Sequence, residues 1–158
     1  MGLFSFKKPD EPTIKTLNDL FSFKFKDVPD DSFVISKDLN SEGLEVQHCR
    51  KILSVKECGI FDTLEVILIP PNYKNIVLST TELHRINISD VRKLVDNIFL
   101  LIGKDDDMKG RFDNEDKQTF ERGNFWSRLW IIGVRPFNCM VTLSPPTFEI
   151  SLHGIEKL

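Results

Sequence analysis

The chain has 158 residues, 41% of them hydrophobic and 28% charged, which fits one globular domain and excludes a collagen-like or wholly disordered chain. Its formal net charge of −3 provides no global positive field for a phosphate backbone, so nucleic-acid binding is disfavoured. No apolar run reaches the ~18 residues that a membrane-spanning helix requires, so no membrane span is predicted.

The first 13 residues are predicted to form a flexible N-terminal segment, because residues 7–13 are rich in proline and charge. A single domain is expected over residues 14–158. Its first stretch is ambiguous, since residues 14–21 keep helical spacing while residues 21–25 alternate as a strand does. We expect a short helix that runs into an extended segment there.

Strand-like composition recurs through the first half of the chain. Residues 44–55 and 58–69 are rich in β-branched and aliphatic side chains, which predicts an antiparallel hairpin. Pro70 and Pro71 end the second strand because proline cannot donate to a ladder. Further strands are predicted at 33–35 and 76–79, with a turn over residues 40–43.

Two helices are predicted in the middle of the chain. Residues 90–102 carry an apolar stripe opposite a polar one, and Ser89 is the expected N-cap. A weaker, mostly polar helix is expected at about 114–122, before Gly123. Both are expected to pack on one face of a sheet.

The last third has the pattern of a β-meander, in which short connections favour antiparallel neighbours. Its predicted strands are residues 126–134, 137–143 and 147–152. The fold class predicted from the whole pattern is α+β, a single domain with a mostly antiparallel sheet of about five to seven strands.

The acidic stretch 105–116 lies between the two predicted helices and invites comparison with a calcium loop. Lys109 occupies a ligand position, however, and Asp116 is shorter than the glutamate that usually closes such a loop. The favoured interpretation is a solvated acidic connector, and no metal site is predicted.

Motifs for catalysis and for common cofactors are absent from the sequence, so no catalytic residue and no cofactor are predicted. Three cysteines without paired spacing favour reduced, buried thiols and a cytoplasmic location. His48 and Cys49 are adjacent on a strand and should face opposite sides, which argues against a thiol nucleophile activated by that histidine.

The most informative segment is Phe125–Trp130, where strand alternation puts Trp126, Arg128 and Trp130 on one face. Two arrangements are open. If a helix covers this face, the tryptophans belong to the core and Arg128 lies along them with its charged group in water. If the face is open, it is a patch of residue types that dominate binding hot spots, and these three residues are the candidate binding site.

The predicted function is a non-enzymatic protein-binding domain that uses this aromatic-arginine face, either an inhibitor or immunity-type protein or a dedicated chaperone. Homodimerisation through the same face is a further possibility. The alternative is a small-ligand site or an enzyme with a sheet-lined pocket, with Glu82, His84 and His48 as acid-base candidates. An open face predicts that Arg128→Glu leaves the fold intact and abolishes partner binding.

Overall fold

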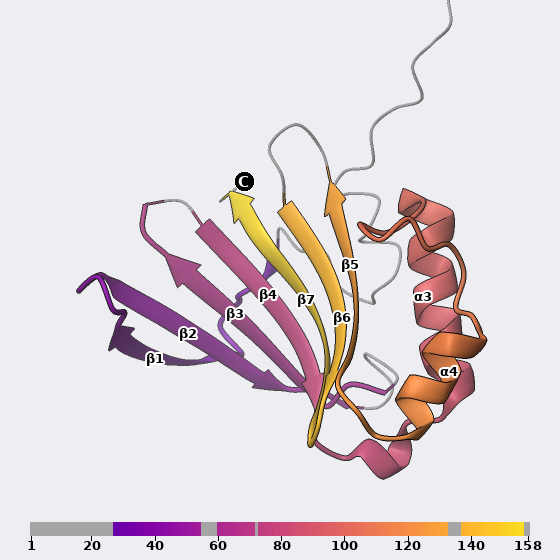
Figure 1. Ribbon diagram of the computed structural model, residues 1–158. Helices are drawn as coiled ribbons and strands as arrows, with labels where there is room; N and C mark the ends of the chain where they lie inside the picture. Colours follow the sequence, from indigo (N-terminus) through magenta and orange to yellow (C-terminus); the bar gives the residue numbers. More distant parts are fainter. Residues whose placement is uncertain (1–26, 55–59, 72, 133–136, 157–158) are drawn as a thin grey trace, which may run out of the picture.

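The computed structural model describes residues 27–54, 60–71, 73–132 and 137–156. In this part of the chain it has one seven-stranded antiparallel sheet and two α-helices, which confirms the predicted α+β fold (Figure 1). The expectations for residues 1–26, and for Cys58, lie outside the described residues. The strands are β1 Val34–Leu39, β2 Glu45–Ile52, β3 Thr63–Ile69, β4 Tyr73–Thr80, β5 Trp126–Ile132, β6 Phe137–Ser144 and β7 Thr147–Glu156.

The strand order across the sheet is β1-β2-β3-β4-β7-β6-β5. Successive hairpins place β1 to β4 side by side, as short connections favour. The chain then passes through both helices and returns as the predicted meander, with β7 beside β4. This topology leaves β1 at one edge of the sheet and β5 at the other.

Helix α3 spans Ile88–Ile102 and begins two residues earlier than Asp90. Its N-cap is Asn87 instead of the expected Ser89, because the Asn87 side chain accepts a hydrogen bond from the Asp90 amide at 3.0 Å. Helix α4 spans Asn114–Glu121, close to its predicted bounds. A short 3-10 helix, η3, covers Leu83–Arg85.

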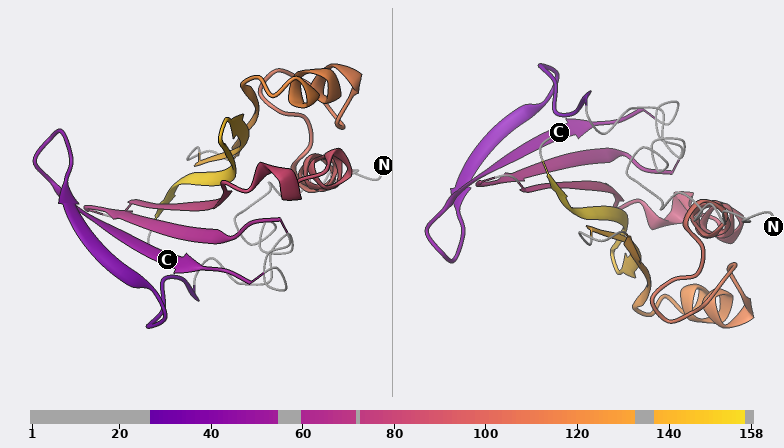
Figure 2. Two further views of the ribbon diagram at one scale, coloured as in Figure 1. Left: turned by 90° about the horizontal axis from the view of Figure 1, so that it is seen from below. Right: turned by 90° about the horizontal axis from the view of Figure 1, so that it is seen from above.

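The hydrophobic core lies on the face of the sheet that the helices cover. Val91, Val95 and Ile98 form the buried stripe of α3, as the apolar spacing predicted. Both helices lie toward the β5 end of the sheet and away from β1 (Figure 1, Figure 2). The far edge of the sheet is therefore not covered by either helix.

Side chains alternate along β7, and Phe148, Ile150 and Leu152 on one face are all buried in the core. Ser151, on the opposite face of β7, is fully buried as well. It lies between Val77 and Met140 on the neighbouring strands, both of which are partly buried and larger. The Ser151 hydroxyl is also 2.9 Å from His153 Nε2, so its larger neighbours enclose this small side chain.

No helix within the described ranges is long and apolar enough to cross a membrane.

Cys49 and Cys139 are free thiols in the core, as expected of small hydrophobic residues. Burial raises the pKa of Cys139 to about 12 and also raises the pKa of Cys49. Since only the thiolate is a strong nucleophile, both groups should be unreactive in the native protein.

We predict that, in a Cys58→Ser variant at pH 8, Cys49 and Cys139 react with a thiol reagent at least about a hundredfold more slowly than after unfolding in urea. Time-resolved labelling with Ellman's reagent measures this difference. Rapid native labelling of either thiol would contradict its position in a closed core.

Candidate functional site

The aromatic-arginine face of β5 is covered. Trp126, Arg128 and Trp130 are only 5%, 2% and 1% exposed, whereas Ser127 and Leu129 on the opposite face are partly exposed. The strand alternation was therefore predicted correctly, and the structure has the covered arrangement of the two that the sequence left open. The charged group of Arg128 is not in water, contrary to the expectation for that arrangement.

Arg128 is buried because acceptors surround its guanidinium. Its Nη1 donates to Asp116 Oδ2 at 2.7 Å and its Nη2 donates to the Gly110 carbonyl at 2.6 Å. Its Nε forms an ion pair with the Asp105 carboxylate. A buried cation with two carboxylates and a carbonyl around it avoids the large cost of an unpaired internal charge.

The two tryptophans extend this polar network. Trp126 donates from Nε1 to Asp116 Oδ1 at 3.0 Å, and Trp130 donates from Nε1 to the Gly103 carbonyl at 3.1 Å. The Trp126 ring also meets Phe112 and Phe120 edge-on, with ring centroids 5.9 Å and 5.8 Å away. The face therefore binds the protein's own helical layer to β5.

The acidic connector is not simply solvated, which corrects the interpretation of residues 105–116. Asp105 and Asp116 are only 5% and 2% exposed, because both pair with Arg128 across the gap to β5. Lys109 Nζ lies 2.9 Å from Glu115 and 3.9 Å from Asp116, and the hydrogen bond to Glu115 raises the pKa of this lysine. No group of three or more potential metal ligands occurs among the described residues.

Sequence reasoning missed Asp105 and Asp116 as the partners of Arg128. One available signal was physical: an arginine between two tryptophans needs a counter-charge if its face is covered. Another was the Asp113-to-Asp116 spacing at the start of α4, where both halves of a capping box are formed. That motif places Asp116 in the first helical turn, with its side chain at the Asp113 amide and facing β5.

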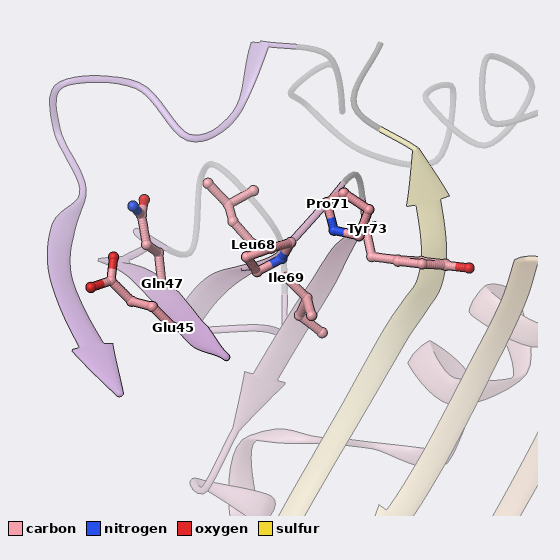
Figure 3. A pocket seen from close by; sticks show the side chains of 7 residues that line it. Glu45, Gln47, Leu68, Ile69, Pro71 and Tyr73 are labelled. Carbon is pink, nitrogen blue, oxygen red and sulfur yellow. The ribbon is translucent and has the colours of Figure 1, made fainter. Parts of the chain in front are cut away.

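A shallow pocket of about 170 Å³ lies at the end of β3, beside the starts of β2 and β4 (Figure 3). It is smaller than the several hundred Å³ typical of drug-sized ligand sites. The acid-base candidates Glu82, His84 and His48 do not line it. Its lining residues are Glu45, Gln47, Leu68, Ile69, Pro70, Pro71 and Tyr73.

The two histidines among the acid-base candidates lie on different elements. His84 lies exposed on η3, whereas His48 lies on β2 and pairs through Nδ1 with Glu65 Oε1 at 2.9 Å. Cys49 is buried in the core beside His48 in sequence, which matches the prediction that the two face opposite sides. Within the described ranges, His48 therefore contacts Glu65 and not a cysteine thiol.

The strand β1 forms the exposed edge of the sheet, and all six of its residues are exposed. Val34, Ile35 and Leu39 are 75%, 58% and 73% exposed, which is unusual for large apolar side chains on a strand. Lys37 forms an exposed ion pair with Glu45 on β2 at 2.8 Å. The edge combines apolar side chains with one cation, Lys37, and one anion, Asp38, which alternation places on opposite faces.

Hydrogen bonding leaves part of the β1 backbone facing outward. The backbone amide of Asn40 donates to the Leu44 carbonyl at 2.9 Å, at the end of the β1–β2 ladder. Because hydrogen-bonded pairs alternate along an antiparallel ladder, residues 34, 36 and 38 face β2. The amide and carbonyl groups of Ile35, Lys37 and Leu39 consequently point away from the sheet.

The opposite edge of the sheet differs from β1. There, the backbone amide of Asp106 donates to the Leu129 carbonyl of β5 at 2.8 Å. The connector between α3 and α4 therefore occupies part of the β5 edge. Protected edges of this kind resist pairing with another chain.

Comparisons with protein-family models, with curated proteins and with solved structures found no match for this chain. Function is therefore inferred from the surfaces of the chain itself.

We predict that Arg128→Met lowers the free energy of unfolding by about 3–5 kcal/mol, because it leaves the Asp105 and Asp116 carboxylates buried without their cation. Arg128→Glu should unfold the protein by adding a third carboxylate. Urea titration followed by tryptophan fluorescence measures both effects. The control is Lys93→Glu, which makes the same charge change as Arg128→Glu at an exposed position of α3. It should lower the free energy of unfolding by less than about 0.5 kcal/mol.

Restoring neutrality provides the second test of this network. Adding Asp105→Asn and Asp116→Asn to Arg128→Met should recover part of the lost stability, since no charge is then buried alone. A folded Arg128→Met variant within about 1 kcal/mol of wild type would show that the ion pairs are not needed to cover β5.

We predict that Asp113→Ala destabilises the protein by about 1 kcal/mol at pH 7, because it removes the N-cap of α4. Hydrogen bonding from the Asp116 backbone amide lowers the pKa of Asp113. The charge-dependent part of its contribution is therefore present above the unfolded pKa and is lost as the pH falls through the lower folded value. Asp113→Asn keeps an acceptor and should retain most of the stability; equal losses in both variants across pH 3–7 would argue against the cap.

Proposed function

We propose that this chain is a non-enzymatic protein-binding domain and that it accepts an extended segment of another protein along the exposed edge strand β1. The observation that carries the proposal is the exposure of every residue in β1, with the outward backbone groups of Ile35, Lys37 and Leu39. Strand addition uses such groups for affinity and alternate side chains for specificity.

The surface differs from the aromatic-arginine face expected from the sequence. Because Trp126, Arg128 and Trp130 contact the chain's own helical layer, a partner would have to displace that layer to reach them. Binding at β1 requires no such opening. An inhibitor, immunity-type protein or dedicated chaperone could each use an edge strand, and the two buried free thiols support a reducing, cytoplasmic setting.

The experiment is a quantitative pull-down from the source cells with three forms of the protein: wild type, Lys37→Pro and Lys37→Arg. Lys37→Pro removes an outward amide that β2 does not use, and proline is tolerated on strand edges. Lys37→Arg retains both the amide and the charge. We predict that a near-stoichiometric partner binds wild type and Lys37→Arg and is lost with Lys37→Pro.

Circular dichroism and urea unfolding must first show that Lys37→Pro retains the fold. A partner that still binds this folded variant would place the interaction elsewhere on the protein. The absence of any specific partner for wild type would count against a protein-binding function.

A further inference from the structure

We infer that the segment accepted by β1 has an acidic residue between two apolar ones, in the pattern apolar-x-acidic-x-apolar. This inference rests on the proposed strand addition. It follows from the order of side chains along β1, where Ile35, Lys37 and Leu39 alternate with Val34, Ser36 and Asp38.

Ile35, Lys37 and Leu39 share the side of the sheet that carries the core. Ile35 lies opposite Cys49, which is buried in the core. Lys37 lies opposite Gln47, and Leu39 lies opposite Glu45. A strand added beside β1 would continue these rows. Its side chains on this face would therefore lie opposite an apolar residue, a lysine and another apolar residue, in that order.

The two apolar positions of the accepted segment are inferred from the exposed apolar side chains of β1. Ile35 and Leu39 keep more than half of their surface in water, so opposing apolar side chains would remove that surface from solvent. Cross-strand pairs of apolar residues and of opposite charges both stabilise a ladder. The partner is thus recognised by its backbone and by three alternate side chains.

The acidic central position of the accepted segment is inferred from the positive charge of Lys37. Lys37 has its ammonium group at the exposed ion pair with Glu45, where both side chains are about half exposed. An acidic residue on the added strand would lie on the other side of the same lysine. A basic residue there would face a like charge, which is destabilising directly across a ladder.

A second copy of this chain fits the edge less well than such a segment. If two β1 strands paired antiparallel about Lys37, the two lysines would lie directly opposite each other. If the pairing were centred on Ser36, Lys37 would oppose Ile35 of the second copy, and no opposite charge would be matched. Charge therefore favours a different chain with an acidic central residue.

The test uses two capped peptides, Thr-Val-Thr-Glu-Thr-Val-Thr and the same peptide with lysine in place of glutamate. Their palindromic pattern gives the same side-chain order in either strand direction. Titration into the full chain is followed by NMR, which reports the affinity and the hydrogen-exchange protection of the Ile35, Lys37 and Leu39 amides.

We predict that wild type binds the glutamate peptide about fivefold more tightly than the lysine peptide and protects these amides. In Lys37→Glu the preference should reverse, whereas Lys37→Pro should lose binding of both peptides. Lys37→Arg serves as the control that keeps the charge.

Equal affinity for the two peptides, or a preference unchanged in Lys37→Glu, would overturn the inferred pattern while leaving strand addition intact if the three amides are protected. Binding without this protection would overturn the inference by placing the peptide elsewhere, and so would a failure of both peptides to bind. The pull-down tests the protein-binding function separately, so the two failures can be told apart.

Discussion

The burial of the Arg128 guanidinium is the constraint on which the helical half of the structure depends. An internal cation must be matched by acceptors, and here these come from Asp105 after α3 and from Asp116 in the first turn of α4. Buried ion pairs add little net stability compared with apolar packing, but a missing member is costly. The network therefore acts mainly by specifying where the connector and α4 lie against β5.

The same arrangement makes the two edges of the sheet unequal. Once Asp105 is drawn toward Arg128, the next residue reaches the β5 edge, and its amide bonds to Leu129. Because β5 and β1 lie at opposite ends of the strand order, the helical layer that protects one edge cannot protect the other. The exposure of β1 follows from this topology as much as from its own residues.

Local pattern was enough to predict the elements, and the predicted α+β fold is confirmed. Alternation correctly gave the face shared by Trp126, Arg128 and Trp130, since side-chain direction in a strand is a local property. What covers that face is not local, so the pairing of Arg128 with Asp105 and Asp116 was missed. The exposure of β1 was missed for a related reason, because it depends on the order of strands across the sheet. The helix start was wrong by two residues because both Asn87 and Ser89 are good N-cap residues.

The residues of β1 combine two opposing tendencies of an edge strand. Val34, Ile35 and Leu39 favour pairing with another strand, whereas a lysine within a short edge is a common means of preventing aggregation. Lys37 does not oppose all pairing equally, because its charge repels a second lysine and attracts a carboxylate. A residue that discourages self-association can therefore also select the partner. This combination supports selective strand addition over an edge that is protected from every chain.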